Sequence, residues 1–332
     1  MKPFSLIGGL AVALVCGPLS AGAQTEASYD AELQGYPYPF PVERFEFESQ
    51  QQPLQMAYMH LRGDGRKPTV VLLHGKNFSG AYWAQTAQFL QSRGYGVLIP
   101  DQIGFGKSSK PAHYQFSFAQ LADNTRALIR KLKIEKPIVV GHSMGGMLAT
   151  RYALMYGNEV ERLILVNPIG LEDYLEYVEY KPIDFFYAAQ LKQTAESVKA
   201  YQLKFYYDGK WDEAYDELVE FQIGWINSPD WPQVAWNNAL TYDMIFTQPV
   251  CNEWSRLQVP TRLIIGTRDR TGPGRDWKKA GVTYLLGQYQ NLGKQTAAAI
   301  PDAKLYELEG LGHMPQIEAF DRFVAEFEKA LQ

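Results

Sequence analysis

The stretch IVVGHSMGG, residues 138–146, decides the fold, because it joins an apolar strand, a glycine-bounded turn and the start of a helix. A G-x-S-x-G sequence between a strand and a helix is typical of a nucleophile elbow, in which small residues let the two elements approach closely. Gly141 and Gly145 supply those small residues. Ser143 would stand clear of the sheet at a helix N-terminus, whose dipole favours developing negative charge. The segment predicts a serine nucleophile rather than a structural glycine-rich turn.

Apolar strands and amphipathic helices alternate on both sides of this segment. Residues 69–73 form a continuous apolar run, as expected of a strand that is buried on both faces. The alternation predicts an α/β fold with a mostly parallel sheet and right-handed crossovers, with residues 43–48 and 54–61 as antiparallel edge strands. The other expected strands are 96–99, 138–140, 163–166, 262–265 and 304–308, and the expected helices are 80–93, 118–132, 144–156, 284–299 and 317–331.

The alternation is interrupted by residues 171–255, which contain no strand-like apolar run and are expected to be wholly helical. This block holds 19 of the 45 aromatic residues in the chain. In open α/β sheets, ligands bind at the carboxyl ends of the strands. An aromatic helical insertion between two strands therefore predicts a lid over that end of the sheet.

His313 is the candidate general base, because a serine hydroxyl needs a base to become a good nucleophile. It lies in Gly310-Leu311-Gly312-His313, between the last expected strand and the last expected helix. Glycines before it allow the loop to reach back over the edge of the sheet. Three other histidines are interpreted as surface or core residues: His60, His113 and His142.

Asp269 is the candidate carboxylate that orients the imidazole. It follows the strand expected at 262–265, which gives the chain order Ser, Asp, His that this kind of site requires. Its neighbours Arg268 and Arg270 leave open a surface ion pair as the alternative role. The end of the preceding strand, another location for the acid, carries Asn167 instead, which favours Asp269. Two further carboxylates remain as alternatives, Asp276 and Asp302.

Two backbone N–H groups are expected to form an oxyanion hole, one from Met144 and one from Lys76. Gly75 would let the backbone turn so that the second N–H points at the developing negative charge. Each donor of this kind stabilises the transition state by about 3 kcal/mol. His74 is interpreted as a support of this loop. Whether the side chain of Lys76 or that of Asn77 also contacts substrate stays open.

These features resemble the α/β-hydrolase fold family in its lidded form, over about residues 42–332. The turn at residues 101–108 also matches a D-x-x-G-x-G-x-S sequence of that family, in which it is structural, so Asp101 is given no catalytic role. The resemblance implies an eight-stranded sheet, a catalytic triad of Ser143, Asp269 and His313, and a cap inserted after the sixth strand.

Serine at the elbow narrows the reaction. The similar haloalkane dehalogenases and epoxide hydrolases carry aspartate there, so Ser143 favours acyl transfer to water. The aromatic cap favours a small, largely apolar substrate, and a carboxylic ester is the preferred bond. A C–C hydrolase of the meta-cleavage type and an aminopeptidase are alternatives within the fold. A ligand-binding receptor that keeps the triad with little turnover is the alternative of another class.

Composition excludes other classes of protein. The chain of 332 residues has a formal net charge of −4, with no basic excess of the kind that nucleic-acid binding requires. Its five histidines show no metal-ligand spacing, so neither a metal nor another cofactor is expected.

The N-terminal residues predict export. Lys2, an apolar run at 4–15 and Ala21-Gly22-Ala23 are typical of a signal peptide that is cleaved after Ala23, which predicts a periplasmic or secreted protein without a stable membrane span. Cleavage there would leave Cys251 as the single cysteine. Residues 24–42, with alternating prolines, are expected to form an extended arm on the surface of the domain.

Overall fold

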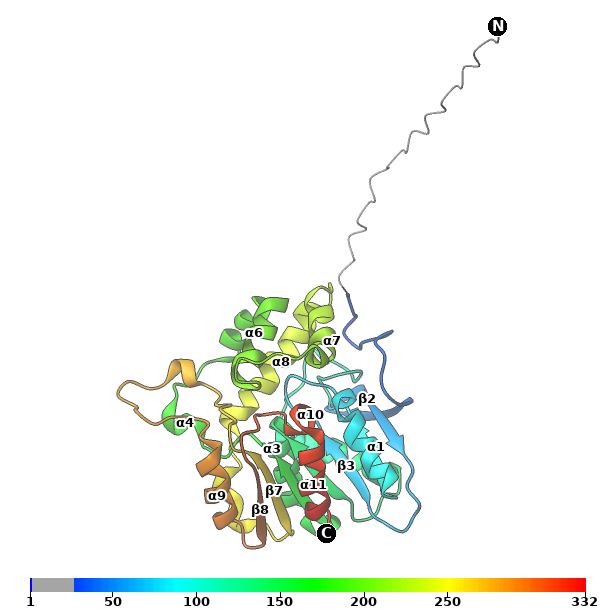
Figure 1. The fold of residues 1–332 in the computed structure, drawn as a ribbon, viewed down its shortest axis with the longest axis vertical. Coiled ribbons are helices and arrows are strands. Elements are labelled where there is room, and N and C mark those ends of the chain that lie inside the picture. The colour runs from blue at the N-terminus through cyan, green and yellow to red at the C-terminus, as the bar shows by residue number, and fades with distance from the viewer. Residues whose placement is uncertain (2–26) are drawn as a thin grey trace.

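The computed structural model describes Met1 and residues 27–332, and it is built around an eight-stranded sheet with helices on both faces (Figure 1). The strand order is β1-β2-β4-β3-β5-β6-β7-β8. β1 and β2 pair antiparallel, β2 also pairs antiparallel with β4, and the remaining pairs are parallel. The predicted fold is confirmed. The strands are β1 (Val42–Ser49), β2 (Gln52–Leu61), β3 (Thr69–Leu73), β4 (Gly96–Pro100), β5 (Ile138–His142), β6 (Arg162–Val166), β7 (Thr261–Gly266) and β8 (Ala303–Leu308).

Both faces of the sheet are buried, which explains the continuous apolar runs of its central strands. Val71 belongs to a buried cluster that includes residues of helices α2 (Phe118–Lys131), α3 (Met144–Tyr156) and α9 (Tyr289–Ala299). Its neighbour Val70 belongs to the buried cluster on the other face, which includes residues of α1 (Ala84–Ser92) and α11 (Phe320–Ala330). Because successive side chains of a strand alternate between faces, every position of such a strand must be apolar.

Two expected helices differ from the structure at identifiable residues. The helix expected at 284–299 begins only at Tyr289, because Gly287 has a φ of +75°, which a right-handed helix excludes. The helix expected at 317–331 is split into α10 (Pro315–Glu318) and α11, because Ala319 is extended, with a φ of −152°. Neither difference moves the loops that end at the carboxyl edge of the sheet.

A helical insert follows β6 and covers one end of the sheet (Figure 1). An isolated β-bridge between Val178 and Lys278 is the exception to its helical character. Among the described residues, no helix is both long and apolar enough to cross a membrane. The helices of the insert are α4 (Tyr174–Tyr177), α5 (Ile183–Leu191), α6 (Ala195–Phe205), α7 (Asp216–Ile226) and α8 (Trp231–Thr247).

Residues 27–41 connect the insert to the sheet. Leu33 is fully buried in a cluster with α7 and α8 residues, and the N–H of Tyr29 donates to the carbonyl of Gly224 in α7 (3.0 Å). The hydroxyl of Tyr38 donates to Asp101, directly after β4 (2.6 Å). This segment thus contacts both the insert and the sheet domain. The predicted signal peptide, apart from Met1, lies outside the described residues.

Candidate active site

The turn between β5 and α3 holds Ser143 in a strained backbone conformation, with φ +57° and ψ −124°. This conformation is rare for a residue with a side chain. A Cβ on Gly141 would lie 2.1 Å from the carbonyl oxygen of Gly145, and one on Gly145 would lie 2.3 Å from the carbonyl oxygen of Leu73. The glycines therefore permit the close packing of strand and helix that the sequence predicted, and Ser143 lines a cavity beneath the insert.

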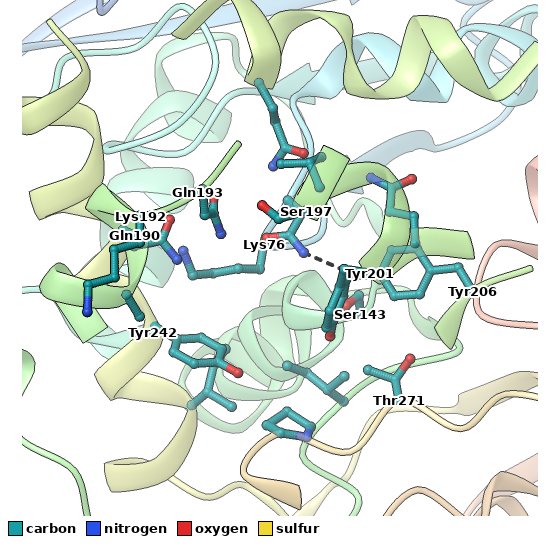
Figure 2. Close-up of a pocket in the computed structure, with 18 residues that line it drawn as sticks. Lys76, Ser143, Gln190, Lys192, Gln193, Ser197, Tyr201, Tyr206, Tyr242 and Thr271 are labelled. Carbon is teal, nitrogen blue, oxygen red and sulfur yellow. Dashed lines mark hydrogen bonds between the residues drawn. The ribbon is translucent and has the colours of Figure 1, made fainter. Parts of the chain in front are cut away.

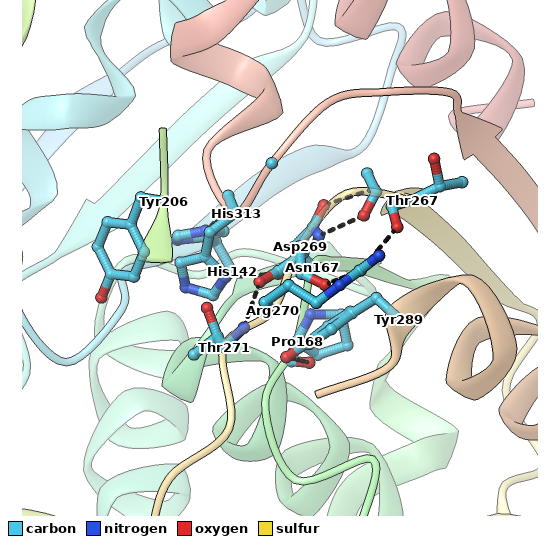
Figure 3. Close-up of polar contacts among 12 residues, drawn as sticks. His142, Asn167, Pro168, Tyr206, Thr267, Asp269, Arg270, Thr271, Tyr289 and His313 are labelled. Carbon is cyan, nitrogen blue, oxygen red and sulfur yellow. Dashed lines mark hydrogen bonds and ion pairs between the residues drawn. The ribbon is translucent and has the colours of Figure 1, made fainter. Parts of the chain in front are cut away.

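His313 and Asp269 are brought together by the loops that follow β8 and β7. Nδ1 of His313 lies 2.7 Å from Oδ2 of Asp269, and both side chains are fully buried (Figure 3). Nε2 of His313 has no hydrogen-bond partner within residues 27–332. The hydrogen bond at Nδ1 thus places the proton of a neutral ring on that atom and leaves Nε2 as a base. No Ser143–His313 hydrogen bond is formed among these residues.

The carboxylate of Asp269 is held in its charged form. Burial raises its pKa, but the electrostatic interaction and hydrogen bond with His313 and an N–H bond from Thr271 (2.7 Å) outweigh burial, and the pKa is lowered. Neither neighbouring arginine binds this carboxylate. Arg268 pairs with Glu318, and Arg270 donates to backbone carbonyls. The alternative carboxylates lie elsewhere: Asp302 pairs with Arg262 at the start of β7, and Asp276 is exposed.

Asn167 is part of this site. The sequence analysis used this residue only to exclude a catalytic acid at the end of the sixth strand. Its Nδ2 donates to Oδ2 of Asp269 (2.8 Å), and its Oδ1 accepts the N–H of Gly266 (2.9 Å). The amide at the end of β6 therefore fixes the carboxylate that follows β7. Its place at the end of a central strand was the available signal.

His142 is a second residue whose role the sequence did not reveal. Of the two interpretations that the sequence allowed, surface or core, the structure shows a buried residue. Its Nε2 lies 2.8 Å from the backbone oxygen of His313, and its Nδ1 lies 3.0 Å from the hydroxyl of Tyr82. Burial, followed by the charge of His313, lowers its pKa well below the usual value, so the ring is neutral. A neutral ring that donates through Nε2 anchors the His313 loop beside the elbow.

The insert contributes Tyr206, which stacks on the ring of His313 with centroids 4.5 Å apart. The backbone of Tyr206 comes so close that a Cβ on Gly312 would lie 2.1 Å from its carbonyl oxygen. Gly312 is therefore needed for close approach as well as for loop flexibility. No local sequence signal distinguishes Tyr206 from the other aromatic residues of the insert.

Of the two expected oxyanion donors, Lys76 lines this cavity and Met144 directly follows Ser143, which also lines it. Met144 is the first residue of α3, so its N–H has no partner within the helix. A Cβ on Gly75 would lie 3.0 Å from Cβ of Ser143, which places the Lys76 loop directly against the elbow. His74 supports this loop: its Nδ1 lies 2.9 Å from the carbonyl of Gly75, and its Nε2 accepts the N–H of Gln102 (3.0 Å).

The cavity has a volume of about 350 Å³ and lies between the sheet and the insert (Figure 2). Both Lys76 and Asn77 line it. Contact of their side chains with substrate stays a prediction. Asn77 Nδ2 donates to the hydroxyl of Tyr206 (3.2 Å). The lining combines aliphatic and aromatic side chains with several amides, among them Gln202 and Gln222.

Comparison with known proteins agrees with this architecture. Residues 68–210 match the model of the alpha/beta hydrolase fold family. A crystal structure of a probable hydrolytic enzyme from Pseudomonas aeruginosa PAO1 is 48% identical, with a TM-score of 0.89 over 92% of this chain and 99% of that one. The chain belongs to the α/β-hydrolase fold family and is a hydrolase of that fold.

Other relatives are more distant. A 2-hydroxy-6-oxononadienedioate/2-hydroxy-6-oxononatrienedioate hydrolase from Comamonas testosteroni is 26% identical over 81% of this chain and 90% of that protein. An esterase from Thermogutta terrifontis shares the fold, with a TM-score of 0.66 and 17% identity over 87% of this chain and 99% of that one. An uncharacterized Mycobacterium tuberculosis protein is 36% identical, but the match covers 32% of this chain and 31% of that protein.

Proposed function

We propose that the protein is a serine hydrolase that cleaves a carboxylic ester of a small substrate through an acyl-enzyme intermediate. The observation that carries the proposal is the buried His313–Asp269 pair, 2.7 Å apart, which lies at the same sheet edge as the strained Ser143 turn. A serine hydroxyl, an imidazole and a buried carboxylate at the ends of neighbouring strands are the components of a catalytic triad.

In the proposed reaction, Oγ of Ser143 attacks the carbonyl carbon while Nε2 of His313 takes the hydroxyl proton. Asp269 stabilises the imidazolium that forms. The N–H groups of Met144 and Lys76 donate to the oxyanion. His313 then returns the proton to the leaving alcohol, and the C–O bond breaks. Water, deprotonated by His313, attacks the acyl group, which releases the acid and restores Ser143.

A cavity of about 350 Å³ supports a substrate of limited size. The mixed lining accommodates apolar groups along Ile169, Val198 and Ile245 and polar groups along the amides. A second candidate reaction is C–C bond hydrolysis, which the similarity to the Comamonas testosteroni hydrolase favours. Both reactions use the same three side chains and differ in the leaving group.

Hydrolysis of short p-nitrophenyl esters tests the proposal. We expect turnover by the wild-type protein and a loss of about 10⁴-fold or more in kcat for Ser143→Ala. Ser197→Ala removes another hydroxyl from the same cavity and serves as the matched control, with activity retained. A meta-cleavage dienoate in the same panel distinguishes the C–C reaction. A folded protein that turns over neither an ester nor the dienoate would support the receptor alternative.

We also propose that the protein is exported and cleaved after Ala23. The basis is the charged start, the apolar run and the small residues that precede the cleavage point. Mass spectrometry of the periplasmic or secreted protein should find Gln24 as the first residue. A protein that retains residues 1–23 would contradict the proposal.

A further inference from the structure

The lining of the cavity has a charge imbalance that the triad does not explain. It includes two lysines, Lys76 and Lys192, and neither an aspartate, a glutamate nor an arginine among the described residues. The chain as a whole has a formal net charge of −4. A cavity lined by positive charge in an acidic protein attracts negatively charged ligands.

Lys76 is the buried member of this pair, with 9% of its surface exposed. Its Nζ donates to Oδ1 of Asn238 (3.2 Å) and lies 5.5 and 5.8 Å from the ring centroids of Phe105 and Tyr242. Among the described residues it forms no ion pair. Burial lowers the pKa of Lys76 to about 7. A buried ammonium without a counter-ion is costly, and a bound anion would remove that cost.

Gln202 of α6 gives an independent indication of a polar ligand. It lines the same cavity and is 99% buried, with 1% of its surface exposed. Neither its Nε2 nor its Oε1 has a hydrogen-bond partner within the described residues. Buried amide groups are nearly always hydrogen-bonded. A ligand that only fills the cavity with apolar groups would leave Gln202 without a hydrogen-bond partner and Lys76 without a counter-ion.

We infer that the substrate of this site carries a carboxylate, which binds the ammonium group of Lys76 as an ion pair. One ammonium group matches the charge of one carboxylate, whereas a phosphate dianion is usually bound by several cationic donors that include arginine. The inference rests on the proposed function, because it assigns the substrate class of the same cavity. In Figure 2 the Lys76 side chain extends across the cavity, away from Ser143.

The test uses pairs of esters of nearly equal shape. Mono-4-nitrophenyl adipate is compared with 4-nitrophenyl 6-methylheptanoate, in which an isopropyl group replaces the carboxylate. 3-Acetoxybenzoate is compared with 3-isopropylphenyl acetate, which places the charge on the alcohol side. We expect the wild-type protein to favour the carboxylate in at least one pair by about 10-fold in kcat/KM. The pair that responds shows which side of the ester faces Lys76.

The ratio within each pair is then measured in variants, because a ratio cancels changes that affect both esters equally. Lys76→Met should bring the ratio to about one, and Lys76→Arg should retain most of it. Lys192→Met is the matched control, since it removes an exposed ammonium group from the same cavity. Its effect should stay below about threefold because water and salt screen an exposed charge.

Calorimetry separates the two proposals. Ser143→Ala protein should bind the carboxylate ester more tightly than its neutral match, and the additional Lys76→Met change should abolish the difference. If wild-type protein hydrolyses both esters of each pair equally, the carboxylate inference is wrong and the hydrolase proposal stands. If neither ester is hydrolysed but the binding preference is present, the hydrolase proposal fails and Lys76 is still the anion site. Equal binding of both esters overturns the inference.

Discussion

The buried carboxylate on the sheet side of the cavity and the buried amide on its insert side differ in how completely they are hydrogen-bonded. On the sheet side, Asp269 accepts bonds from His313, Asn167 and the Thr271 N–H. On the insert side, Gln202 has no partner within the described residues. A fully bonded network holds its members in fixed positions, whereas unsatisfied groups are available to a ligand. The difference indicates that the sheet side performs the chemistry, and that the insert selects the substrate together with Lys76, whose side chain reaches Asn238 of the insert.

The largest expected effect comes from breaking the sheet-side network at Asp269. Asp269→Asn keeps the size of the side chain but removes the charge that stabilises the imidazolium and fixes its tautomer. We expect kcat for ester hydrolysis to fall by about 10⁴-fold, with little change in KM. Steady-state kinetics check this. The matched variant Asp276→Asn, at an exposed carboxylate near by in sequence, should retain wild-type kcat.

The second largest effect is expected from disrupting the close packing of strand and helix at the Ser143 turn. Gly141→Ala would force a Cβ to within 2.1 Å of the Gly145 carbonyl oxygen. We expect the free energy of unfolding to fall by about 3 kcal/mol or more. Gly310→Ala is the control: no atom lies within 4 Å of its Cβ, although its φ is +72°. Its cost should be about 1 kcal/mol. Chemical denaturation measures both, and equal losses would be inconsistent with the close packing described.

A substitution at Asn167 tests how much the positioning of the Asp269 carboxylate contributes to catalysis. Asn167→Ala removes the Nδ2 bond to Asp269, so the carboxylate becomes harder to ionise and less fixed. We expect kcat to fall about 10-fold and the acid limb of the kcat/KM profile to move to higher pH, because the pKa of Asp269 rises. A loss of stability with an unchanged pH profile would assign Asn167 a structural role only.

The smallest expected effect concerns Lys76, which follows β3 on the sheet side and reaches Asn238 of α8 in the insert. Burial holds the pKa of Lys76 at about 7, so the free ammonium loses its proton as the pH rises through that value. Preference for the carboxylate ester over its neutral match should therefore be highest below pH 7 and decline severalfold above it, and Lys76→Arg should remove the decline. A preference that is constant from pH 6 to 9 in the wild-type protein would contradict this protonation behaviour.

The sequence predicted the sheet side well because its functional residues follow strands. The three residues of the predicted triad lie directly after a strand, as Ser143 does, or a few residues beyond its end, as Asp269 and His313 do. The carboxyl ends of parallel strands meet at one edge of the sheet. Asn167 also directly follows a strand, β6, so its position in the sequence indicates a place in the site as a partner of the acid.

The insert side could not be predicted in the same way. Gln202 lies on α6 and Tyr206 directly follows that helix. The orientation of α6 depends on tertiary packing, which the spacing of apolar residues does not determine. Leu33 is another example, because a residue in a polar stretch is fully buried only through its contact with α7 and α8. The structure is needed to show which polar side chains face the cavity.

The most direct test of the central claim is the site and rate of reaction with a fluorophosphonate probe, mapped by peptide mass spectrometry. We expect a single adduct on Ser143 and a labelling rate that falls by about 10³-fold or more in His313→Ala. An adduct on another residue, or equal labelling rates in the wild-type and His313→Ala proteins, would contradict the central claim.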